Sequence, residues 1–401
     1  MGSISKRVTS MAVSATLAMS KKSRDLKAQG IEVIDLSVGE PDFNTPDFIK
    51  RAGIKAIEDD FSHYPPVAGF LDLQQAVCTK LKRDNGLDYS PNQIIVSNGA
   101  KHSLMNIFMA MVDPGEEVII PVPYWVSYPE MVKFVDGIPV FIPTTGEQNF
   151  KITPEQLEAA ITPKTKLLLF NSPSNPSGMV YSRDELRALA NVLERYPEIY
   201  IVSDEIYELI VFDDTKFESF AQFPSLRERM ILVNGVSKGF AMTGWRIGYI
   251  AAPVEIAAAY NKVQGQMTSA ASSIAQKAAV TALLRAPSES SDLHDMVTTF
   301  KHRRDILLEM LEEIKGFKTL KPTGAFYVFP DISALLGKRY GQHIIKSGDD
   351  LANYLIEVAH VAIVGGDSFG SPNHIRISYA TNTDKLIAAI NQIKAAVALL
   401  S

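Results

Sequence analysis

The sequence predicts an α/β fold, with a mainly parallel sheet covered by helices on both faces and a smaller second domain. Short apolar runs alternate with helix-like segments from about residue 94 to residue 252, which is typical of a parallel sheet built from crossover units. With 401 residues and 46% hydrophobic content, the chain can bury one large core and a smaller one. A serine-rich segment at residues 286–291 is the best candidate hinge.

Charge and cysteine content argue against several classes of protein. The formal net charge of −5 is spread along the chain without blocks, which indicates neither a nucleic-acid groove nor a membrane surface. The single cysteine, Cys78, excludes an internal disulfide and is typical of a reducing compartment. Serine and threonine interrupt the apolar residues at positions 8–20, so this segment does not predict a signal peptide, and we expect a cytoplasmic protein.

The first strand of the predicted sheet, at residues 92–97, passes through a small-residue turn into an apolar helix at 104–112. The free backbone amides at Gly99 and Ala100 form a potential anion site. Lys101 follows in the first helical turn, where a cation opposes the helix dipole. A second bound anion near Lys101 would explain this unfavourable placement. Alternatively, Lys101 is an ordinary exposed lysine and the unfavourable interaction with the helix dipole costs little free energy.

Three later strands each lead to a polar side chain. They cover residues 166–170, 198–203 and 230–234, and the side chains are those of Asn175, Asp204 and Lys238. In an open α/β sheet, ligands bind at the carboxyl ends of the strands, so we expect these side chains to meet there. Each residue also has an ordinary explanation, namely a turn residue, a helix N-cap and a solvated loop lysine, respectively.

Lys238 lies in a glycine-bounded turn, and Arg246 follows eight residues later. Desolvation and a fixed neighbouring cation both favour the neutral amine, which is the form that makes Schiff bases. The arrangement therefore predicts an amine beside a bound phosphate, with a phosphate-bearing aldehyde as its partner.

The carboxyl-terminal third predicts the second domain. A small-residue helix at 267–284 precedes the hinge and a long amphipathic helix at 292–314 follows it. Next come a strand at 324–329, a helix at 350–359, strands at 361–364 and 374–380, and a helix from Asp384. Alternation in the strand at 374–380 puts Arg376 and Ser378 on one face, which the local pattern alone predicts to be exposed. The polar stretch at 333–350 predicts a surface excursion.

Several motifs, in order along the chain, carry a resemblance to a known family. They are Leu36-Ser-Val-Gly39-Glu-Pro-Asp-Phe, His63-Tyr64-Pro-Pro-Val-Ala-Gly, Pro123-Tyr-Trp125-Val-Ser-Tyr128-Pro, Ser172-Pro-Ser-Asn175-Pro, Val202-Ser-Asp204-Glu-Ile-Tyr207, Ser237-Lys238-Gly-Phe and His374-Ile-Arg376-Ile-Ser-Tyr. Each is weak alone, but together they are specific. Over nearly its whole length the chain resembles the class I, fold-type I aminotransferases that depend on pyridoxal 5′-phosphate (PLP), and within them the bacterial aspartate aminotransferase subgroup.

The resemblance implies a domain organisation and an assembly. A large PLP-binding domain at residues 46–290 would contain a mainly parallel seven-stranded sheet between helices. A small α/β domain would be formed by residues 1–45 and 291–401. Tyr64 resembles a tyrosine that reaches the cofactor phosphate from the neighbouring subunit, so a homodimer with shared active sites is expected.

The resemblance also implies roles for individual residues. Lys238 would form the Schiff base and shuttle the α-proton, Asp204 would keep the pyridine nitrogen protonated, and Tyr207 would tune the phenolic oxygen. The implied cofactor-binding residues are Tyr64, Gly99, Ala100, Lys101, Trp125, Asn175, Asp204, Tyr207, Ser237, Lys238 and Arg246. The implied substrate-binding residues are Gly39, Lys101, Trp125, Asn175 and Arg376. Among these, Arg376 would grip the α-carboxylate and Lys101 the distal carboxylate. No metal is implied.

The implied reaction is ping-pong transfer of the amino group of aspartate to 2-oxoglutarate. Aminotransferases of aromatic or other amino acids, and carbon–sulfur lyases, share the fold and are alternatives. Some subgroup members also use prephenate and carry a basic residue in the segment that here contains Ala12, whose lack of charge argues against that activity. Ligand-sensing regulators of this fold carry a winged helix ahead of it, and no such segment precedes Ile31.

A serine hydrolase is a separate hypothesis. Residues 235–239 fit the GxSxG nucleophile elbow, with Ser237 after a strand. Asp331 with His360 or His374 could complete a triad. The hypothesis leaves the polar residues that follow the other strands without a role.

Overall fold

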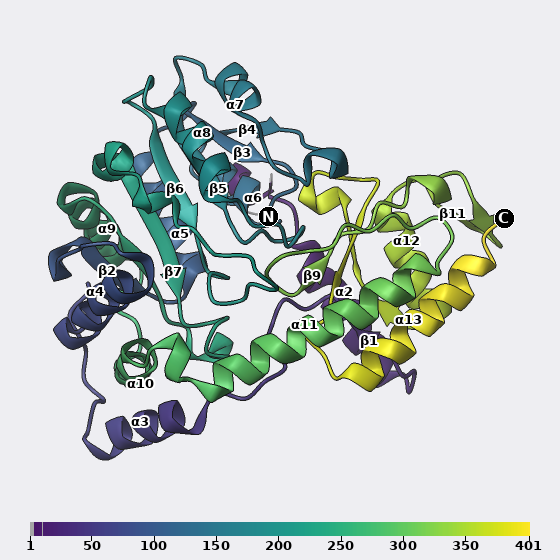
Figure 1. Cartoon of the computed structure of the whole chain (residues 1–401), viewed down its shortest axis with the longest axis horizontal. Coiled ribbons are helices and arrows are strands. Elements are labelled where there is room, and N and C mark those ends of the chain that lie inside the picture. Colours follow the sequence, from purple (N-terminus) through teal and green to yellow (C-terminus); the bar gives the residue numbers. More distant parts are fainter. Residues whose placement is uncertain (1–3, 10) are drawn as a thin grey trace.

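The computed structural model describes residues 4–9 and 11–401, which form a large part built on one sheet and a smaller part beside it (Figure 1). The α-helices are α1 (Lys6–Thr9), α2 (Ala15–Ala28), α3 (Asp47–Glu58), α4 (Leu71–Asn85), α5 (Ala100–Met111), α6 (Tyr128–Phe134), α7 (Pro154–Ala160), α8 (Arg183–Leu193), α9 (Val254–Met267), α10 (Ser273–Leu284), α11 (Ser291–Glu312), α12 (Gly348–Tyr354) and α13 (Thr383–Ala398). The strands are β1 (Ile34–Asp35), β2 (Ile94–Ser97), β3 (Glu117–Pro121), β4 (Ile138–Ile142), β5 (Thr165–Asn171), β6 (Tyr200–Asp204), β7 (Met230–Gly235), β8 (Gly248–Ala251), β9 (Tyr327–Val328), β10 (Arg339–Tyr340), β11 (His343–Ile344), β12 (Val361–Ala362), β13 (Val364–Gly365) and β14 (Ile375–Ser378).

The large part contains a seven-stranded sheet in the order β2-β8-β7-β6-β5-β3-β4. Neighbouring strands are parallel except at β8, which is antiparallel to β2 and β7. The predicted α/β fold with a mainly parallel sheet is therefore confirmed. Because β5, β6 and β7 are parallel neighbours, their carboxyl ends lie side by side, where ligands bind in sheets of this kind.

Helices cover both faces of this sheet. In β5, Leu168 and Phe170 belong to a core shared with α4, α8 and α10, whereas Leu167 and Leu169 belong to a core shared with α5, α6 and α9. Successive side chains of a strand point to opposite faces, so a continuous apolar run is fully buried only if both faces are covered. The unbroken apolar sequence of the strand thus accounts for the layered arrangement.

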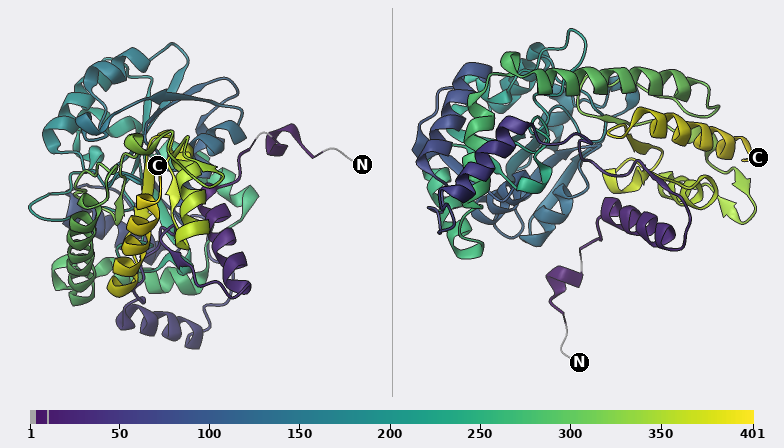
Figure 2. Two further views of the ribbon diagram at one scale, coloured as in Figure 1. Left: turned by 90° about the vertical axis from the view of Figure 1, so that its right-hand side faces the viewer. Right: turned by 90° about the horizontal axis from the view of Figure 1, so that it is seen from below.

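The smaller part contains the three-stranded sheet β13-β14-β9 and the parallel pair β1-β12. The β1-β12 pair places a strand from near the amino terminus beside the carboxyl-terminal segment. Helix α11 extends from the large part to the smaller one, where it packs against α13 (Figures 1 and 2). Figure 2 also shows α1 on an extended amino-terminal segment, from which Arg7 forms an ion pair with Asp136 (2.9 Å).

The helix predicted at 267–284 is present but begins later than expected, because α10 covers Ser273–Leu284. Helix α9 ends at Met267 and α10 begins at Ser273. Between them Ser269 has a φ of 64°, and the hydroxyl of Ser272 accepts a hydrogen bond from the N–H of Ala275 (3.4 Å). Hydroxyl side chains compete with helical backbone hydrogen bonds, so this segment caps the second helix and does not continue the first.

Two predictions for the smaller part also need correction. The strand predicted at 361–364 is divided between β12 and β13, which belong to different sheets. The face of Arg376 is buried, not exposed, because β14 is the central strand of its sheet and all four of its residues are buried. The polar stretch at 333–350 includes the hairpin β10–β11, in which Tyr340 and Ile344 are exposed. Within residues 4–9 and 11–401, no helix is long and apolar enough to cross a bilayer.

Candidate active site

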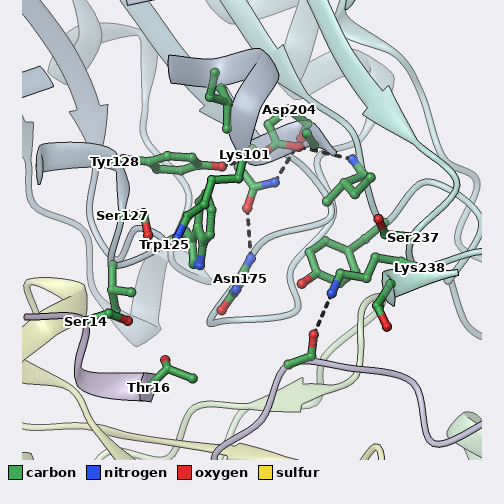
Figure 3. A pocket seen from close by; sticks show the side chains of 18 of the residues that line it. Ser14, Thr16, Lys101, Trp125, Ser127, Tyr128, Asn175, Asp204, Ser237 and Lys238 are labelled. Atoms are coloured by element: carbon green, nitrogen blue, oxygen red, sulfur yellow. Dashed lines mark hydrogen bonds between the residues drawn. The ribbon is translucent and has the colours of Figure 1, made fainter. Parts of the chain in front are cut away.

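A cavity of about 270 Å³ lies at the carboxyl ends of β5, β6 and β7, and residues of the three-stranded sheet, Tyr327 and Arg376, also line it. Figure 3 shows the side chains around it. Most of the predicted site residues line it, namely Gly39, Ala100, Lys101, Trp125, Asn175, Asp204, Tyr207, Ser237, Lys238, Arg246 and Arg376. Of the other two, Gly99 is the residue immediately before the lining Ala100, and Tyr64 lies elsewhere. The tertiary structure thus assembles residues that are distant in sequence.

Lys238 follows β7 and is half-buried in the cavity wall. Its Nζ donates a hydrogen bond to the backbone oxygen of Gly39 (2.5 Å). Desolvation, reinforced by Arg376 and Arg246, lowers the pKa of Lys238 to about 8 against the opposing charges of Glu40 and Asp204. Neutral amine is therefore far more abundant at neutral pH than for an ordinary lysine.

Asp204 is the last residue of β6, and its carboxylate is buried. Tyr128, at the start of α6, donates its hydroxyl to Oδ2 of Asp204 (2.8 Å), and the N–H of Ile206 donates to Oδ1 (3.3 Å). Burial raises the pKa of Asp204 to about 6, although both hydrogen bonds act to lower it. The chain turns after Asp204 and no helix begins there, so the helix N-cap explanation is wrong.

Arg376 on β14 is 1% exposed and carries an unfilled donor. Its Nη1 donates to Oδ1 of Asn175 (3.0 Å) and its Nη2 to the backbone oxygen of Ser37 (2.6 Å). Its Nε has no hydrogen-bond partner in the part of the chain that the structure describes. Burial lowers the pKa of the guanidinium below its ordinary value. A buried donor without an acceptor in a cavity wall suits an oxygen of an anionic ligand.

Asn171 connects the loops that carry Asn175 and Asp204. Its Oδ1 accepts a hydrogen bond from the N–H of Asn175 (2.9 Å), and its Nδ2 donates to the backbone oxygen of Asp204 (2.9 Å). These bonds hold the polar ends of two neighbouring strands in register, so the turn at Asn175 is part of the cavity architecture.

Tyr207 and Tyr327 form a buried hydroxyl pair in the same cavity. Their oxygens are 2.8 Å apart, and burial raises the pKa of both phenols. Tyr207 follows β6 of the large sheet, whereas Tyr327 belongs to β9 of the three-stranded sheet. The pair therefore joins the two parts of the molecule across the cavity.

The cavity near the start of α5 is positively charged. Nζ of Lys101 lies 5.1 Å from the ring centroid of Trp125, and desolvation, followed by the charge of Arg246, lowers the pKa of Lys101. Gly99 has a φ of 84°, and a Cβ there would clash with the guanidinium of Arg246, so glycine permits this approach to the helix amides. Among the lining residues, four cations (Lys101, Lys238, Arg246, Arg376) face one carboxylate, so the cavity suits an anionic ligand.

Ser237 lines the cavity but is not arranged as a nucleophile. No hydrogen bond joins its side chain to a histidine within residues 4–9 and 11–401. His374 stacks on Phe329 with ring centroids 4.9 Å apart, and Nδ1 of His360 has no partner in this same set of residues. The nucleophile elbow also requires an α-helix directly after the turn, whereas here a short 3-10 helix (Thr243–Trp245) and then β8 follow β7. The serine-hydrolase hypothesis is therefore wrong.

Sequence reasoning missed several cavity residues, chiefly Tyr128, Asn171 and Tyr327. Tyr128 follows Trp125 by three residues, a spacing that could have placed both on one helical face. Tyr327 is hidden in an apolar run that predicts an ordinary buried strand. Ser14 and Thr16, near the start of α2, also line the cavity (Figure 3) and carried no signal.

Comparisons with known proteins agree with this arrangement. A family model described as aminotransferase class I and II matches residues 31–393. An aspartate aminotransferase of Pinus pinaster is 45% identical over 99% of this chain and 81% of its own length. An aspartate/prephenate aminotransferase of Cereibacter sphaeroides is 49% identical over 97% of each chain. The solved structure of an aspartate aminotransferase from Rhizobium meliloti, 43% identical, covers 100% of both chains with a TM-score of 0.96.

Proposed function

The chain belongs to the class I and II aminotransferases, and from this membership we propose that it transfers the amino group of aspartate to 2-oxoglutarate with PLP as its cofactor. Relatives at 45–49% identity are named aspartate or aspartate/prephenate aminotransferases, so aspartate is common to their names. The observation that supports a dicarboxylic substrate is that two cationic side chains, Arg376 and Lys101, line one cavity. Asp204 is the acidic side chain among the residues that line it.

The lining residues fit PLP in charge and shape. The amides at the start of α5 and the guanidinium of Arg246, which lies against Gly99, would hold a phosphate. The buried carboxylate of Asp204 would pair with the protonated ring nitrogen, and Trp125 would cover one face of the ring. When bound, PLP supplies an aldehyde carbon that amines attack and a cationic ring that accepts the electrons of a broken Cα–H bond.

Lys238 would hold the cofactor and move a proton at its Nζ. With a pKa of about 8, roughly a quarter of this amine is neutral at pH 7.5, compared with about 0.1% for an unperturbed lysine. The neutral form can bond to an aldehyde carbon and can accept a proton. Hydrogen bonds from Tyr128 and the backbone hold Asp204 in the charged state that a cationic ring needs, and a bound cation would lower its pKa further.

Arg376 and Lys101 would select a dicarboxylic substrate. The unfilled Nε of Arg376, together with a neighbouring Nη, can meet the α-carboxylate with two parallel hydrogen bonds. Lys101 is exposed in the cavity and forms no ion pair within the described ranges of the chain, so it is available for a second carboxylate. One amino acid held at both ends brings its α-carbon to the region of Lys238.

The active site is proposed to be completed in a cytoplasmic homodimer. Tyr64 is 96% exposed in the single chain, and on helix α3 the apolar side chains Ile54 and Ile57 are exposed as well. These features support a subunit interface there, through which the partner subunit's Tyr64 would reach the phosphate. The partner role of Tyr64 stays a prediction.

A half-reaction survey tests the proposal. The PLP-loaded protein is mixed with aspartate, glutamate, alanine, phenylalanine and, separately, prephenate with an amino donor, and the change in the visible absorbance of the cofactor is followed. We expect rapid conversion by aspartate and glutamate. Borohydride should fix the cofactor on Lys238 in the wild type and not in Lys238→Ala. Equal or faster conversion by phenylalanine would refute the dicarboxylate assignment, and a correctly folded protein that binds no PLP would refute the cofactor assignment.

A further inference from the structure

Tyr327 contacts two residues of the proposed site, Tyr207 and Arg376, and has no functional role in the proposal above. It is fully buried in β9, lines the cavity, and had no place in the sequence interpretation. Its hydroxyl and its ring contact different partners. The two contacts can therefore be separated by substitution.

The hydroxyl of Tyr327 lies between two groups close to Lys238. It is 2.8 Å from the hydroxyl of Tyr207, which has no other hydrogen-bond partner in the described structure. It also lies against Gly39, because a Cβ added at Gly39 would clash with it. The backbone oxygen of Gly39 in turn accepts the hydrogen bond from Nζ of Lys238. The Tyr327 hydroxyl therefore sets the position of Tyr207 and limits that of Gly39.

The ring of Tyr327 supports Arg376. The guanidinium carbon lies 4.6 Å from the ring centroid of Tyr327 and 5.0 Å from that of Phe369. A guanidinium taken out of water gains from aromatic faces, particularly where desolvation has weakened its hydration. Asn175 and Ser37 accept hydrogen bonds from the two Nη atoms of Arg376. The two rings limit rotation of the guanidinium plane about these bonds. The Nε without a partner is thereby held in one direction.

We propose that Tyr327 is a positioning residue with two separable actions: its ring holds Arg376 for the substrate carboxylate, and its hydroxyl holds Tyr207 as a donor toward the cofactor oxygen. The inference rests on the proposed function, because it assigns a cofactor to Tyr207 and a carboxylate to Arg376. If the Tyr207 hydroxyl donates its hydrogen bond to the cofactor oxygen, it must accept the hydrogen bond that it shares with Tyr327. A hydroxyl that accepts one hydrogen bond is a stronger donor in the next.

Two substitutions separate these actions. Tyr327→Phe removes the hydroxyl and keeps the ring, whereas Tyr327→Leu removes both. The matched controls are Tyr379→Phe and Tyr379→Leu, because Tyr379 is equally buried and donates one hydrogen bond, to the backbone oxygen of Ala325 (3.2 Å), but does not line the cavity. Two readouts are independent of turnover: the pH midpoint of the visible absorbance of bound PLP, and the dissociation constant of maleate, a dicarboxylate without an amino group.

We expect Tyr327→Phe to raise the pH midpoint by about 0.4 to 1 unit and to change maleate affinity by less than about twofold. The direction follows because donation to the cofactor oxygen favours the form with more negative charge there, which is the form that has lost its proton. Tyr327→Leu should show the same shift and also weaken maleate binding by about 2- to 30-fold. The Tyr379 variants should change neither quantity.

The inference is overturned if Tyr327→Phe leaves the midpoint in place, or if the Phe and Leu variants weaken maleate equally. If Tyr327→Leu does not fold, Tyr327→Met takes its place, since methionine fills more of the ring volume without an aromatic face. Wild-type protein that shows no PLP band or no maleate binding would count against the proposed function, whereas a normal wild type with unchanged variants would count against Tyr327 alone.

Discussion

Replacement of Lys101 by glutamine tests how the cavity selects its substrate. Lys101 lies on the first turn of α5, exposed in the cavity and 5.1 Å from the ring centroid of Trp125. Glutamine has nearly the same reach and keeps a hydrogen-bond donor, but it removes the charge. If Lys101 meets the distal carboxylate, Lys101→Gln should impair reaction with aspartate and leave reaction with alanine unchanged.

The size of the effect follows from the surroundings of Lys101. A hydrogen bond to a charged group is worth about 1.5–3 kcal/mol when buried, whereas exposed ion pairs contribute about 0–1 kcal/mol. Lys101 is exposed, yet desolvation and Arg246 lower its pKa, so its charge is less well hydrated than at an open surface. An intermediate value of about 1–2 kcal/mol corresponds to a 5- to 30-fold fall in kcat/KM for aspartate.

The assay is single-turnover conversion of the PLP-loaded protein by aspartate and by alanine, with kcat/KM obtained for each. Lys315→Gln is the control, because Lys315 is exposed after α11 and does not line the cavity. The informative quantity is the aspartate-to-alanine ratio, which cancels any general loss of active protein. An equal fall for both substrates would refute the carboxylate role and would place Lys101 among the residues that act on the cofactor.

Three further predictions concern the protein without substrate. Cofactor-free Asp204→Asn should be more stable than wild type by up to about 3 kcal/mol at pH 7, with the difference disappearing by pH 4. The pKa of Asp204 in the folded protein, about 6, lies above its ordinary value of 3.8, so the cost of the buried charge arises only as the pH increases through that interval; urea unfolding between pH 4 and 7 measures it. Lys80→Met should cost about 3–5 kcal/mol in urea unfolding, because it leaves the buried carboxylate of Glu208 without its ion pair. Adding Glu208→Leu should recover only part of the loss, because the buried amides of Asn85 and Asn234 then lose their acceptor; a double variant less stable than Lys80→Met would contradict this. Gly99→Ala should weaken PLP binding about tenfold, because alanine is strained at a φ of 84° and its Cβ would displace the guanidinium of Arg246. A fluorescence titration measures the affinity, and an unchanged value would exclude the phosphate role of this turn.

The sequence predicted the layered fold because its signals are local. Unbroken apolar runs such as β5 and β7 are buried on both faces, and each run ends at a recognisable polar residue. The parallel order then brings Asp204 and the turn at Lys238 to one edge without further information. Motif resemblance added the family, which the comparisons confirm. The domain boundaries and the individual site roles stay predictions.

The partners of these residues were not predictable in the same way. Tyr128 contacts Asp204 across 76 residues, and Tyr327 contacts Tyr207 across 120. Each of these tyrosines lies in an apolar segment, where an aromatic residue is expected as core whether or not its hydroxyl has a function. Likewise, the alternation of the strand at Arg376 indicated an exposed face, because the pattern does not report that β13 and β9 lie on either side.

By itself, the amino-acid sequence predicted the strands that lead to Asn175, Asp204 and Lys238 and the sheet edge at which these side chains meet. These properties depend on neighbours within a few residues, where backbone geometry fixes what can meet. Only the tertiary structure decided the electrostatic state of the site: the lowered pKa of Lys238, the raised pKa of Asp204 and the unfilled donor of Arg376. Desolvation and charge act through space, so they exist only once distant segments are packed together.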